Sequence, residues 1–219
     1  MKIGIFGGSF NPIQKGHTRL ANYIVSSGVV DMVLMMPCYK SLYNKELLDG
    51  ETRLKMIELA DRLPHVQPFD WEIKNKIDGI GTYDIMKMLE GYFENRSIGL
   101  IKEDDKLKLY DREIIGSFGP RLPDEIYFII GLDNSQKVKS WLNGDKIIKE
   151  LKFIVVPRNG VNTSDIWFME PPHIWLGSYE GDDVSSSGVK ELLRNGGDLE
   201  HHLDKEVKDY IITNQLYKE

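Results

Sequence analysis

The 219-residue chain has a single cysteine, Cys38, so it contains no intramolecular disulfide and no multi-cysteine zinc site. It also lacks a long apolar run, since no stretch approaches the roughly 20 residues that a membrane-spanning helix needs. The first ten residues are too short and too glycine-rich for the hydrophobic part of a signal peptide. We therefore expect a soluble, cytoplasmic protein with no membrane partner, held together by packing and hydrogen bonds.

Positive charge is scarce as well. The chain has 28 Lys and Arg against 34 Asp and Glu, a formal net charge of -6 at pH 7, and no basic stripe interleaved with aromatic residues. Binding of nucleic acid over a broad face is thereby disfavoured. A small anionic substrate stays compatible, because a pocket needs only a few cations and backbone amides. With 41% hydrophobic and 28% charged residues, the composition is that of an ordinary globular protein.

Short apolar runs alternate with helical patterns along the chain. The runs end at or near glycine or proline and predict buried parallel strands over residues 2–6, 29–36, 66–73, 125–130 and 152–156. Apolar residues at helical spacing predict helices from about residue 16, over 51–63, over 83–93 and twice after residue 185. This order predicts an α/β fold, a Rossmann-like parallel sheet flanked by helices.

The segment from about 95 to 124 interrupts this alternation. It carries the run Lys-Glu-Asp-Asp-Lys at 102–106, followed by several glycines and prolines. Such a composition predicts an inserted loop or small hairpin on the surface. The chain shows no repeat, low-complexity tract or linker. We therefore predict one domain over residues 1–219, with a surface insertion at about 95–124.

The segment from Gly7 to His17 is the most informative part of the sequence about function. Glycines after a buried strand allow a tight turn and expose backbone amides, and a helix that begins near Gly16 points its positive dipole end at the same space. Such a site suits phosphate. His17, on the first turn, can donate a hydrogen bond to a phosphoryl oxygen and offset charge that grows in the transition state. The competing interpretation of this segment is an ordinary turn between a strand and a helix, in which His17 has no catalytic role.

Residues 8–17, Gly-Ser-Phe-Asn-Pro-Ile-Gln-Lys-Gly-His, resemble the G-[ST]-F-[DN]-P-x-H-x-G-H signature of the nucleotidyltransferase superfamily with an HxGH motif. Gln14 stands where that family has its first histidine. Residues 184–190, Val-Ser-Ser-Ser-Gly-Val-Lys, resemble the second signature, I-S-S-T-x-I-R, with Lys190 in place of the arginine. Both matches are degenerate, but they occur in the order and at the separation that the family shows. The resemblance implies the fold of the HxGH nucleotidyltransferases.

Within that superfamily the middle of the chain resembles nicotinate mononucleotide adenylyltransferases. Trp141 lies ten places after Gly131, as does the tryptophan that stacks on the pyridine ring in that family, whereas the family's tyrosine falls on Gly81. Four segments carry the match: Phe-Ile-Ile-Gly-Leu-Asp at 128–133 (F-I-I-G-A-D), Val-Val-Pro-Arg-Asn-Gly at 155–160 (V-x-x-R-P-G), Glu-Thr-Arg-Leu-Lys-Met at 51–56 (H-R-L-x-M) and Gly-Thr-Tyr-Asp at 81–84 (S-Y-T-x-D). The resemblance covers most of the chain outside 95–124.

The resemblance implies an adenylyltransferase whose partners are ATP and a pyridine mononucleotide. The mononucleotide phosphate attacks the α-phosphorus of ATP and pyrophosphate leaves, while Mg²⁺ is bound mainly through ATP and needs no dedicated protein site. The implied catalytic residues are His17, Lys190 and Gln14. The implied contacts to ATP and its phosphates are Gly7, Gly8, Ser9, Phe10, Gly16, Lys45, Gly131, Asp133, Arg158, Ser185 and Ser186. The implied contacts to the mononucleotide are Thr82 and Trp141. A homo-oligomer is left open.

Two alternatives stay open at this stage. Glutamine at position 14 donates a hydrogen bond but carries no charge, so the chain can also be interpreted as a catalytically weak nucleotide-binding sensor of the same fold. The other alternative is an adenylyltransferase with a different phosphorylated acceptor, such as pantetheine phosphate. Trp141 favours a pyridine nucleotide but does not separate nicotinate from nicotinamide mononucleotide. Each of three predicted site residues can also be interpreted without a function. Trp141 can be a core residue, Arg158 can cap the end of a strand, and Lys45 can be a solvated charge in a loop.

Overall fold

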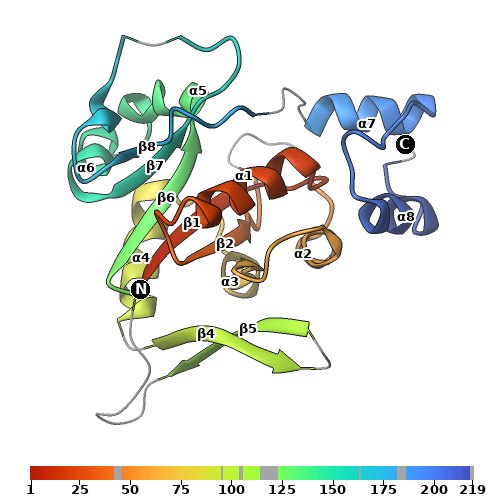
Figure 1. Ribbon diagram of the computed structural model, residues 1–219, viewed down its shortest axis with the longest axis horizontal. Coiled ribbons are helices and arrows are strands. Elements are labelled where there is room, and N and C mark those ends of the chain that lie inside the picture. The colour runs from red at the N-terminus through yellow and green to blue at the C-terminus, as the bar shows by residue number, and fades with distance from the viewer. Residues whose placement is uncertain are drawn as a thin grey trace.

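The protein is described here by a computed structural model that covers residues 1–41, 46–94, 96–103, 106–113, 123–162, 164–181 and 186–217. These residues form a six-stranded parallel sheet in the order β3-β2-β1-β6-β7-β8 and a separate sheet of two strands, β4 and β5 (Figure 1). Helices flank the larger sheet. The predicted α/β fold with a Rossmann-like parallel sheet is confirmed.

Most of the elements follow the predicted alternation of strands and helices. The strands of the large sheet are β1 (Lys2–Gly8), β2 (Met32–Pro37), β3 (Val66–Pro68), β6 (Glu125–Gly131), β7 (Lys152–Val156) and β8 (Ile174–Trp175). The helices are α1 (Lys15–Ser26), α2 (Gly50–Leu59), α3 (Trp71–Lys74), α4 (Thr82–Phe93), α5 (Leu132–Ser135), α6 (Gly144–Glu150), α7 (Ser186–Asn195) and α8 (Lys205–Thr213), with 3₁₀ turns η1 (Val138–Ser140) and η2 (Trp167–Met169).

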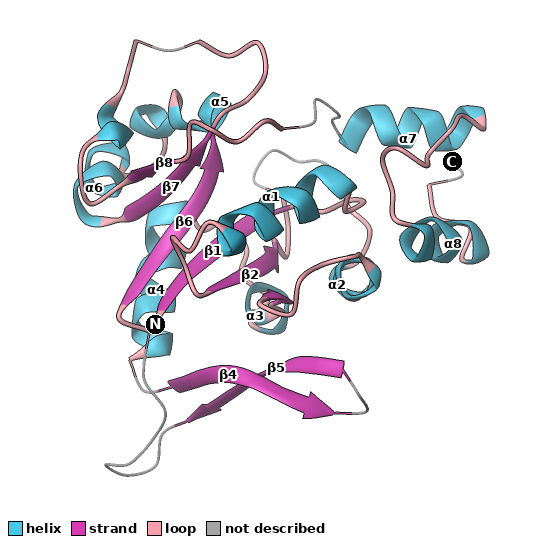
Figure 2. Cartoon of the chain, viewed as in Figure 1, coloured by secondary structure: helices cyan, strands magenta, loops and turns pink. Residues whose placement is uncertain are grey.

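The sheet is buried on both faces. Successive side chains of a strand point to opposite faces, so in β7 Ile154 and Val156 enter one core while Phe153 and Val155 enter the other. Residues of α1, α2, α7 and α8 complete the first core, and residues of α3, α4 and α6 complete the second (Figure 2). Burial on both sides explains why all six residues of β2 are buried and why its sequence is almost continuously apolar.

The strand order reverses between β1 and β6. From β1 the chain moves outward to β2 and β3 and later returns to the other side of β1 as β6. The helix after β1 covers the first core, whereas α6, which follows β6, covers the second. The loops after these two neighbouring strands therefore separate and open a crevice at their carboxyl ends. Packing there is close, because a Cβ atom on Gly7 would lie 3.0 Å from the ring of Phe128 and the ring would have to shift.

The predicted strand over 66–73 is wrong in its second half. β3 ends at Pro68, and the chain turns into the short helix α3. Phe69 and Trp71 alternate with polar residues and so resemble a strand, but both side chains enter the second core, Trp71 from a helical turn. The helix predicted over 51–63 ends early as well, because Ala60 is already extended. β8 was not predicted, since two residues carry no detectable period.

The segment that interrupts the alternation contains a hairpin. β4 (Arg96–Glu103) pairs antiparallel with β5 (Lys106–Glu113) over their whole length. It lies on the side of the large sheet opposite the carboxyl ends of β1 and β6 (Figure 1). The choice between loop and hairpin is thus resolved, while a single domain with an insertion at 95–124 stays a prediction.

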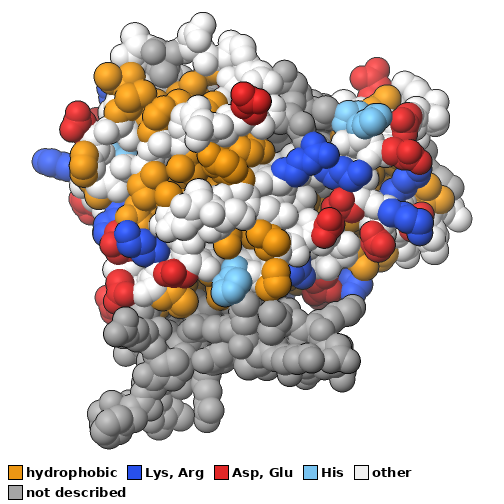
Figure 3. Space-filling model, viewed as in Figure 1, with side chains coloured by type: hydrophobic (Ala, Val, Ile, Leu, Met, Phe, Trp, Pro, Cys, Tyr) orange, Lys and Arg blue, Asp and Glu red, His pale blue; other side chains and the backbone are white. Residues whose placement is uncertain are grey.

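The surface charge and the helices can be compared with the expectation that the protein binds neither nucleic acid nor a membrane. On the face shown in Figure 3, Lys and Arg side chains are interspersed with Asp and Glu, and hydrophobic side chains gather across the centre. The part of this face that the structure describes therefore has no broad patch of positive or of negative charge. Among the described helices, none has both the length and the apolar character to cross a membrane.

Candidate active site

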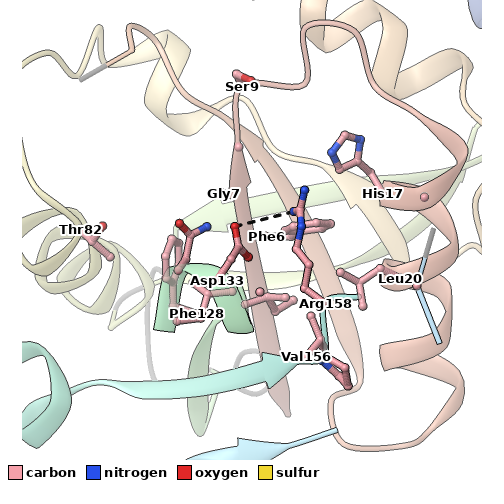
Figure 4. Close-up of a pocket in the computed structure, with 18 of the residues that line it drawn as sticks. Phe6, Gly7, Ser9, His17, Leu20, Thr82, Phe128, Asp133, Val156 and Arg158 are labelled. Atoms are coloured by element: carbon pink, nitrogen blue, oxygen red, sulfur yellow. Dashed lines mark ion pairs between the residues drawn. The ribbon is translucent and has the colours of Figure 1, made fainter. Parts of the chain in front are cut away.

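A cavity of about 590 Å³ opens at the carboxyl ends of β1, β6 and β7 (Figure 4). This volume suits a ligand of the size of a nucleotide. The lining draws on segments from the first strand to the chain after β8. It brings together twelve of the predicted site residues: Gly7, Gly8, Ser9, Phe10, Gln14, Gly16, His17, Thr82, Gly131, Asp133, Trp141 and Arg158.

The orientation of His17 is set by the start of α1. Gln14 is the N-cap residue, and it forms a capping box with His17. The Nδ1 atom of His17 accepts a hydrogen bond from the backbone N–H of Gln14 at 3.1 Å. The rings of Phe10 and Phe6 pack against the imidazole, with centroids 5.3 and 6.1 Å away. Because Nδ1 is an acceptor, the hydrogen of the neutral ring lies on Nε2, which makes Nε2 the donor of a ring that lines the cavity.

The charge of His17 follows from its surroundings. Burial, with a smaller contribution from the positive charge of Arg158, lowers the pKa of His17 to about 4. The ring is therefore neutral at physiological pH. In that state the ring carries a hydrogen-bond donor but no positive charge.

Asp133 carries a buried oxygen atom without a partner. α5 begins immediately after β6 and places this residue in its first turn. Oδ2 lies 3.9 Å from Nη1 of Arg158, the pair drawn in Figure 4, whereas Oδ1 is buried and accepts no hydrogen bond. Gly131 leaves room for this orientation of the carboxylate, because a Cβ atom there would lie 2.6 Å from Oδ1 and displace it. Since buried polar atoms are nearly always paired, this oxygen is suited to a hydroxyl donor on a ligand.

Thr82 and Trp141 line another part of the cavity. Thr82 is the first residue of α4 and lies across the cavity from His17 in Figure 4. Trp141 follows η1, packs in part against the second core and also lines the cavity, so it is more than a core residue. Leu142 beside it also lines the cavity and is 67% exposed. A partly exposed indole next to an exposed leucine offers a flat apolar surface for an aromatic ring.

Four predicted site residues are not placed in the cavity. Lys45 and Ser185 lie outside the described residues. Ser186 is the first residue of α7. Lys190 does not line the cavity; its Nζ atom lies over the ring of Tyr217, 5.4 Å from the centroid. The expected roles of these four residues at the phosphates stay predictions.

The model of the cytidylyltransferase-like family matches residues 5–192. The chain belongs to the cytidylyltransferase-like family. The matched range runs from β1 into α7 and so includes both signature segments, residues 8–17 and 184–190.

Curated relatives carry a more specific name. A protein of Caldicellulosiruptor saccharolyticus named "Probable nicotinate-nucleotide adenylyltransferase" is 26% identical to this chain over 227 residues and matches it over 100% of both lengths. A protein of Dehalococcoides mccartyi with the same name is 29% identical over 226 residues, 99% of this chain and 97% of its own. The family resemblance inferred from the motifs is thereby confirmed.

Solved structures show the same fold. Nicotinic acid mononucleotide adenylyltransferase of Plasmodium falciparum, complexed with NaAD, superposes with a TM-score of 0.73 at 19% sequence identity, covering 99% of this chain and 97% of that one. Its complex with APC gives the same TM-score at 20% identity. At this identity the likeness concerns the arrangement of the elements.

Arg53 supports the site, although sequence reasoning noted it only as part of a matched helix start. It is fully buried in α2. Nε donates to the carbonyl of Leu48 at 2.8 Å, Nη1 to that of Ser9 at 2.9 Å, and Nη2 to that of Cys38 at 2.6 Å. Arg53 thus ties the loop after β1 to the end of β2 and to the approach of α2. A buried guanidinium is stable only when its donors are satisfied, as these are.

The remaining lining residues were not predicted as site residues. Phe6, Phe128 and Val156 lie within the predicted strands, and each is close to a polar or glycine residue that was predicted. Their position near the strand ends is a signal that was available in the sequence. Tyr179 belongs to the segment after β8, which no pattern indicated. The other such residues are Leu20, Gly81, Ile129, Ile130, Asn134, Ser140, Leu142, Pro157, Asn159 and Gly181.

Proposed function

We propose that the protein is a nicotinate-nucleotide adenylyltransferase of NAD biosynthesis, which joins nicotinate mononucleotide to ATP and releases pyrophosphate. One observation carries the proposal: a single cavity holds the neutral His17 donor, the unpartnered oxygen of Asp133 and the partly exposed ring of Trp141. These groups match, in turn, a phosphoryl oxygen, a sugar hydroxyl and an aromatic base. Relatives of that name over the full length of the chain support it.

The reaction is a direct displacement. An oxygen of the mononucleotide phosphate attacks the α-phosphorus of ATP and forms a new P–O bond. The bond from the α-phosphorus to the bridging oxygen breaks, and its electron pair leaves with pyrophosphate. Because no covalent intermediate with the protein forms, catalysis consists of positioning and charge stabilisation.

The phosphate end of the cavity supplies donors. Nε2 of His17 donates to an oxygen of the transferring phosphoryl group, where negative charge grows. The backbone of residues 7–10 and the positive end of α1 cradle the nucleotide phosphates. Lys190, together with Lys45, Ser185 and Ser186, is assigned to the leaving pyrophosphate.

The other groups orient the two nucleosides. Asp133 accepts a hydrogen bond from a ribose hydroxyl of ATP, with Arg158 beside it as a cation near the nucleotide. Trp141 stacks on the pyridine ring, and the backbone at the start of α4, near Thr82, faces the pyridine substituent. Held in this way, the acceptor phosphate lies in line with the bond to be broken.

Magnesium fits this donor set when it is bound mainly through ATP. Within the described residues no three His, Cys, Asp or Glu side chains are grouped to hold a metal. Among the described residues that line the cavity, Asp133 alone has a carboxylate that could contact a metal ion. Mg²⁺ retains water readily and binds to substrate phosphates, so it needs no protein cage. When bound, it neutralises phosphate charge.

The test is an assay of the purified protein with ATP, Mg²⁺ and nicotinate mononucleotide, followed by pyrophosphate release and by chromatography of the dinucleotide. Stoichiometric release of both products at enzyme-like rates supports the proposal. Binding of ATP without turnover would instead favour the nucleotide-binding sensor, the candidate that Gln14 motivates. Turnover with a different phosphorylated acceptor would favour the other alternative. We also propose a cytoplasmic location, because a chain with a single cysteine suits a reducing compartment.

A further inference from the structure

The last described residues of the chain return to the first signature segment. Tyr217 follows α8 and is half-buried, and its hydroxyl donates to Oδ1 of Asn11 at 2.6 Å across 206 positions of sequence. Burial raises the pKa of Tyr217, so the hydroxyl stays a protonated donor. Neither residue lines the cavity.

Asn11 occupies a central position in the loop after β1. It is 2% exposed, its Oδ1 also accepts the backbone N–H of Leu48 at 3.4 Å, and its Nδ2 donates to the carbonyl of Glu46 at 3.3 Å. The preceding residue, Phe10, has a φ of 43°, which is unfavourable for a residue with a side chain. Such a conformation persists only where the surroundings hold it. Asn11 is therefore an anchor of this loop.

The ring of the same tyrosine faces the second signature segment. Lys190 lies on α7, and its ammonium group is 5.4 Å from the centroid of the Tyr217 ring. This distance is typical of a cation–π contact. Tyr217 therefore touches both signature segments, the first through its hydroxyl and the second through its ring.

We propose that Tyr217 is a positioning residue for adenylyl transfer, which holds the loop of residues 7–14 through Asn11 and holds Lys190 through its ring. This inference rests on the proposed function. Tyr217 touches neither substrate. Its effect reaches the reaction through the backbone that cradles the phosphates and through the cation assigned to pyrophosphate.

Three variants test the two contacts. Tyr217→Phe removes the hydroxyl and keeps the ring, whereas Tyr217→Leu removes both. Tyr127→Phe is the matched control, because Tyr127 also donates its hydroxyl to a side chain, that of Glu125, but lies near the amino end of β6 and does not line the cavity. A stability loss alone would affect Tyr217→Phe and the control alike.

We expect Tyr217→Phe to lower kcat about tenfold, because it removes one hydrogen bond that fixes the loop. The KM for nicotinate mononucleotide should stay within about twofold, because Trp141 and Thr82 are untouched. Tyr217→Leu should lower kcat further, and Tyr127→Phe should not change it. A kcat for Tyr217→Phe within about twofold of the wild-type value overturns the proposal. Equal kcat values for the Leu and Phe variants overturn the part that concerns Lys190.

Hydrogen exchange supplies a readout that needs no turnover. Peptides covering residues 7–14 should exchange faster in Tyr217→Phe than in the wild type, while those covering 125–131 should not. Unchanged exchange at 7–14 overturns the proposal whatever the kinetics. If the wild-type protein releases no pyrophosphate, the proposed function fails, and the exchange experiment still decides whether Tyr217 holds the loop.

Discussion

His17 combines a fixed orientation with a suppressed charge. Its Nδ1 atom accepts the backbone N–H of Gln14, and burial lowers its pKa to about 4, so the ring enters the cavity as a neutral donor. A neutral donor binds a phosphoryl oxygen without needing to gain or lose a proton near neutral pH. A bound polyphosphate would raise this pKa and strengthen the donor as charge develops.

Replacement of His17 by alanine is expected to lower turnover about 10²–10³-fold, the typical cost of losing a preorganised donor. Pyrophosphate release at saturating substrates measures the effect, and far-UV circular dichroism checks that the fold persists. His65→Ala is the matched control, since His65 is exposed and does not line the cavity. More than about a tenth of wild-type turnover in His17→Ala would remove His17 from the mechanism.

Gln14 stands where the first signature of the HxGH nucleotidyltransferases has a histidine. It is 5% exposed, lines the cavity and caps α1. We expect Gln14→His to raise kcat and to leave ATP affinity nearly unchanged, because an added imidazole acts mainly on charge that develops during transfer. Steady-state kinetics and calorimetric titration of ATP separate the two effects. A loss of turnover would mean that the site is adapted to glutamine as its helix cap.

At the scale of elements, α3 closes the end of β2. Glu72 of α3 is 6% exposed and accepts the backbone N–H of Tyr39, just beyond β2, at 2.9 Å. Burial raises the pKa of Glu72 to about 7, against the opposing effects of that hydrogen bond and of the Arg53 charge. This carboxyl therefore titrates near neutral pH, although the cavity does not include it.

The raised pKa predicts how stability depends on pH. The folded state holds the Glu72 proton more tightly than the unfolded state, so this stabilisation is complete below pH 4.5 and is lost as the pH rises through 7. Glu72→Gln keeps the neutral form at every pH. Relative to the wild type, its free energy of unfolding should therefore rise by up to about 3 kcal/mol between pH 4.5 and 8.

Urea unfolding of both proteins at several pH values measures this difference. The contribution of His17, which titrates in the opposite sense, is present in both proteins and cancels. A difference that does not vary with pH would show that Glu72 titrates normally in the folded protein.

At the scale of the molecule, the sheet topology brings distant segments to one cavity. β1 and β6 are neighbours in the sheet, although more than a hundred residues separate them in the sequence. Their diverging loops leave space at the carboxyl ends for the predicted ATP and mononucleotide groups together. Because the two substrates would share one cavity, we expect the lining residues near Thr82 to set the preference between acceptors.

Nicotinate mononucleotide is expected to have a higher kcat/KM than nicotinamide mononucleotide, by about one to two orders of magnitude. The start of α4 at Thr82 presents backbone amides and a positive dipole end, which favour a carboxylate over a neutral carboxamide. Gly81 leaves room there, since a Cβ atom on it would make only ordinary contacts with Leu142. Comparing both acceptors at saturating ATP measures the preference. Equal values, or a preference for the amide, would refute the acid assignment and leave the transfer chemistry intact.

Sequence by itself determined the local features of this protein. Apolar runs that alternate with helical spacing predicted the α/β class, because the two periods follow from the geometry of the backbone. The contiguous segment from Gly7 to His17 likewise predicted its turn and helix start. Errors arose where a short element was too brief to show a period, as at α3 and β8.

Only the tertiary structure decided which distant residues meet. The hydrogen bonds of Arg53 and the contact of Tyr217 with Asn11 join residues that no sequence period relates. The unpartnered oxygen of Asp133 is likewise visible only in the folded chain. The lowered pKa of His17 also depends on the burial and the Arg158 charge that folding supplies. Such contacts depend on strand order and on packing between elements, so they become visible only when the whole chain is folded.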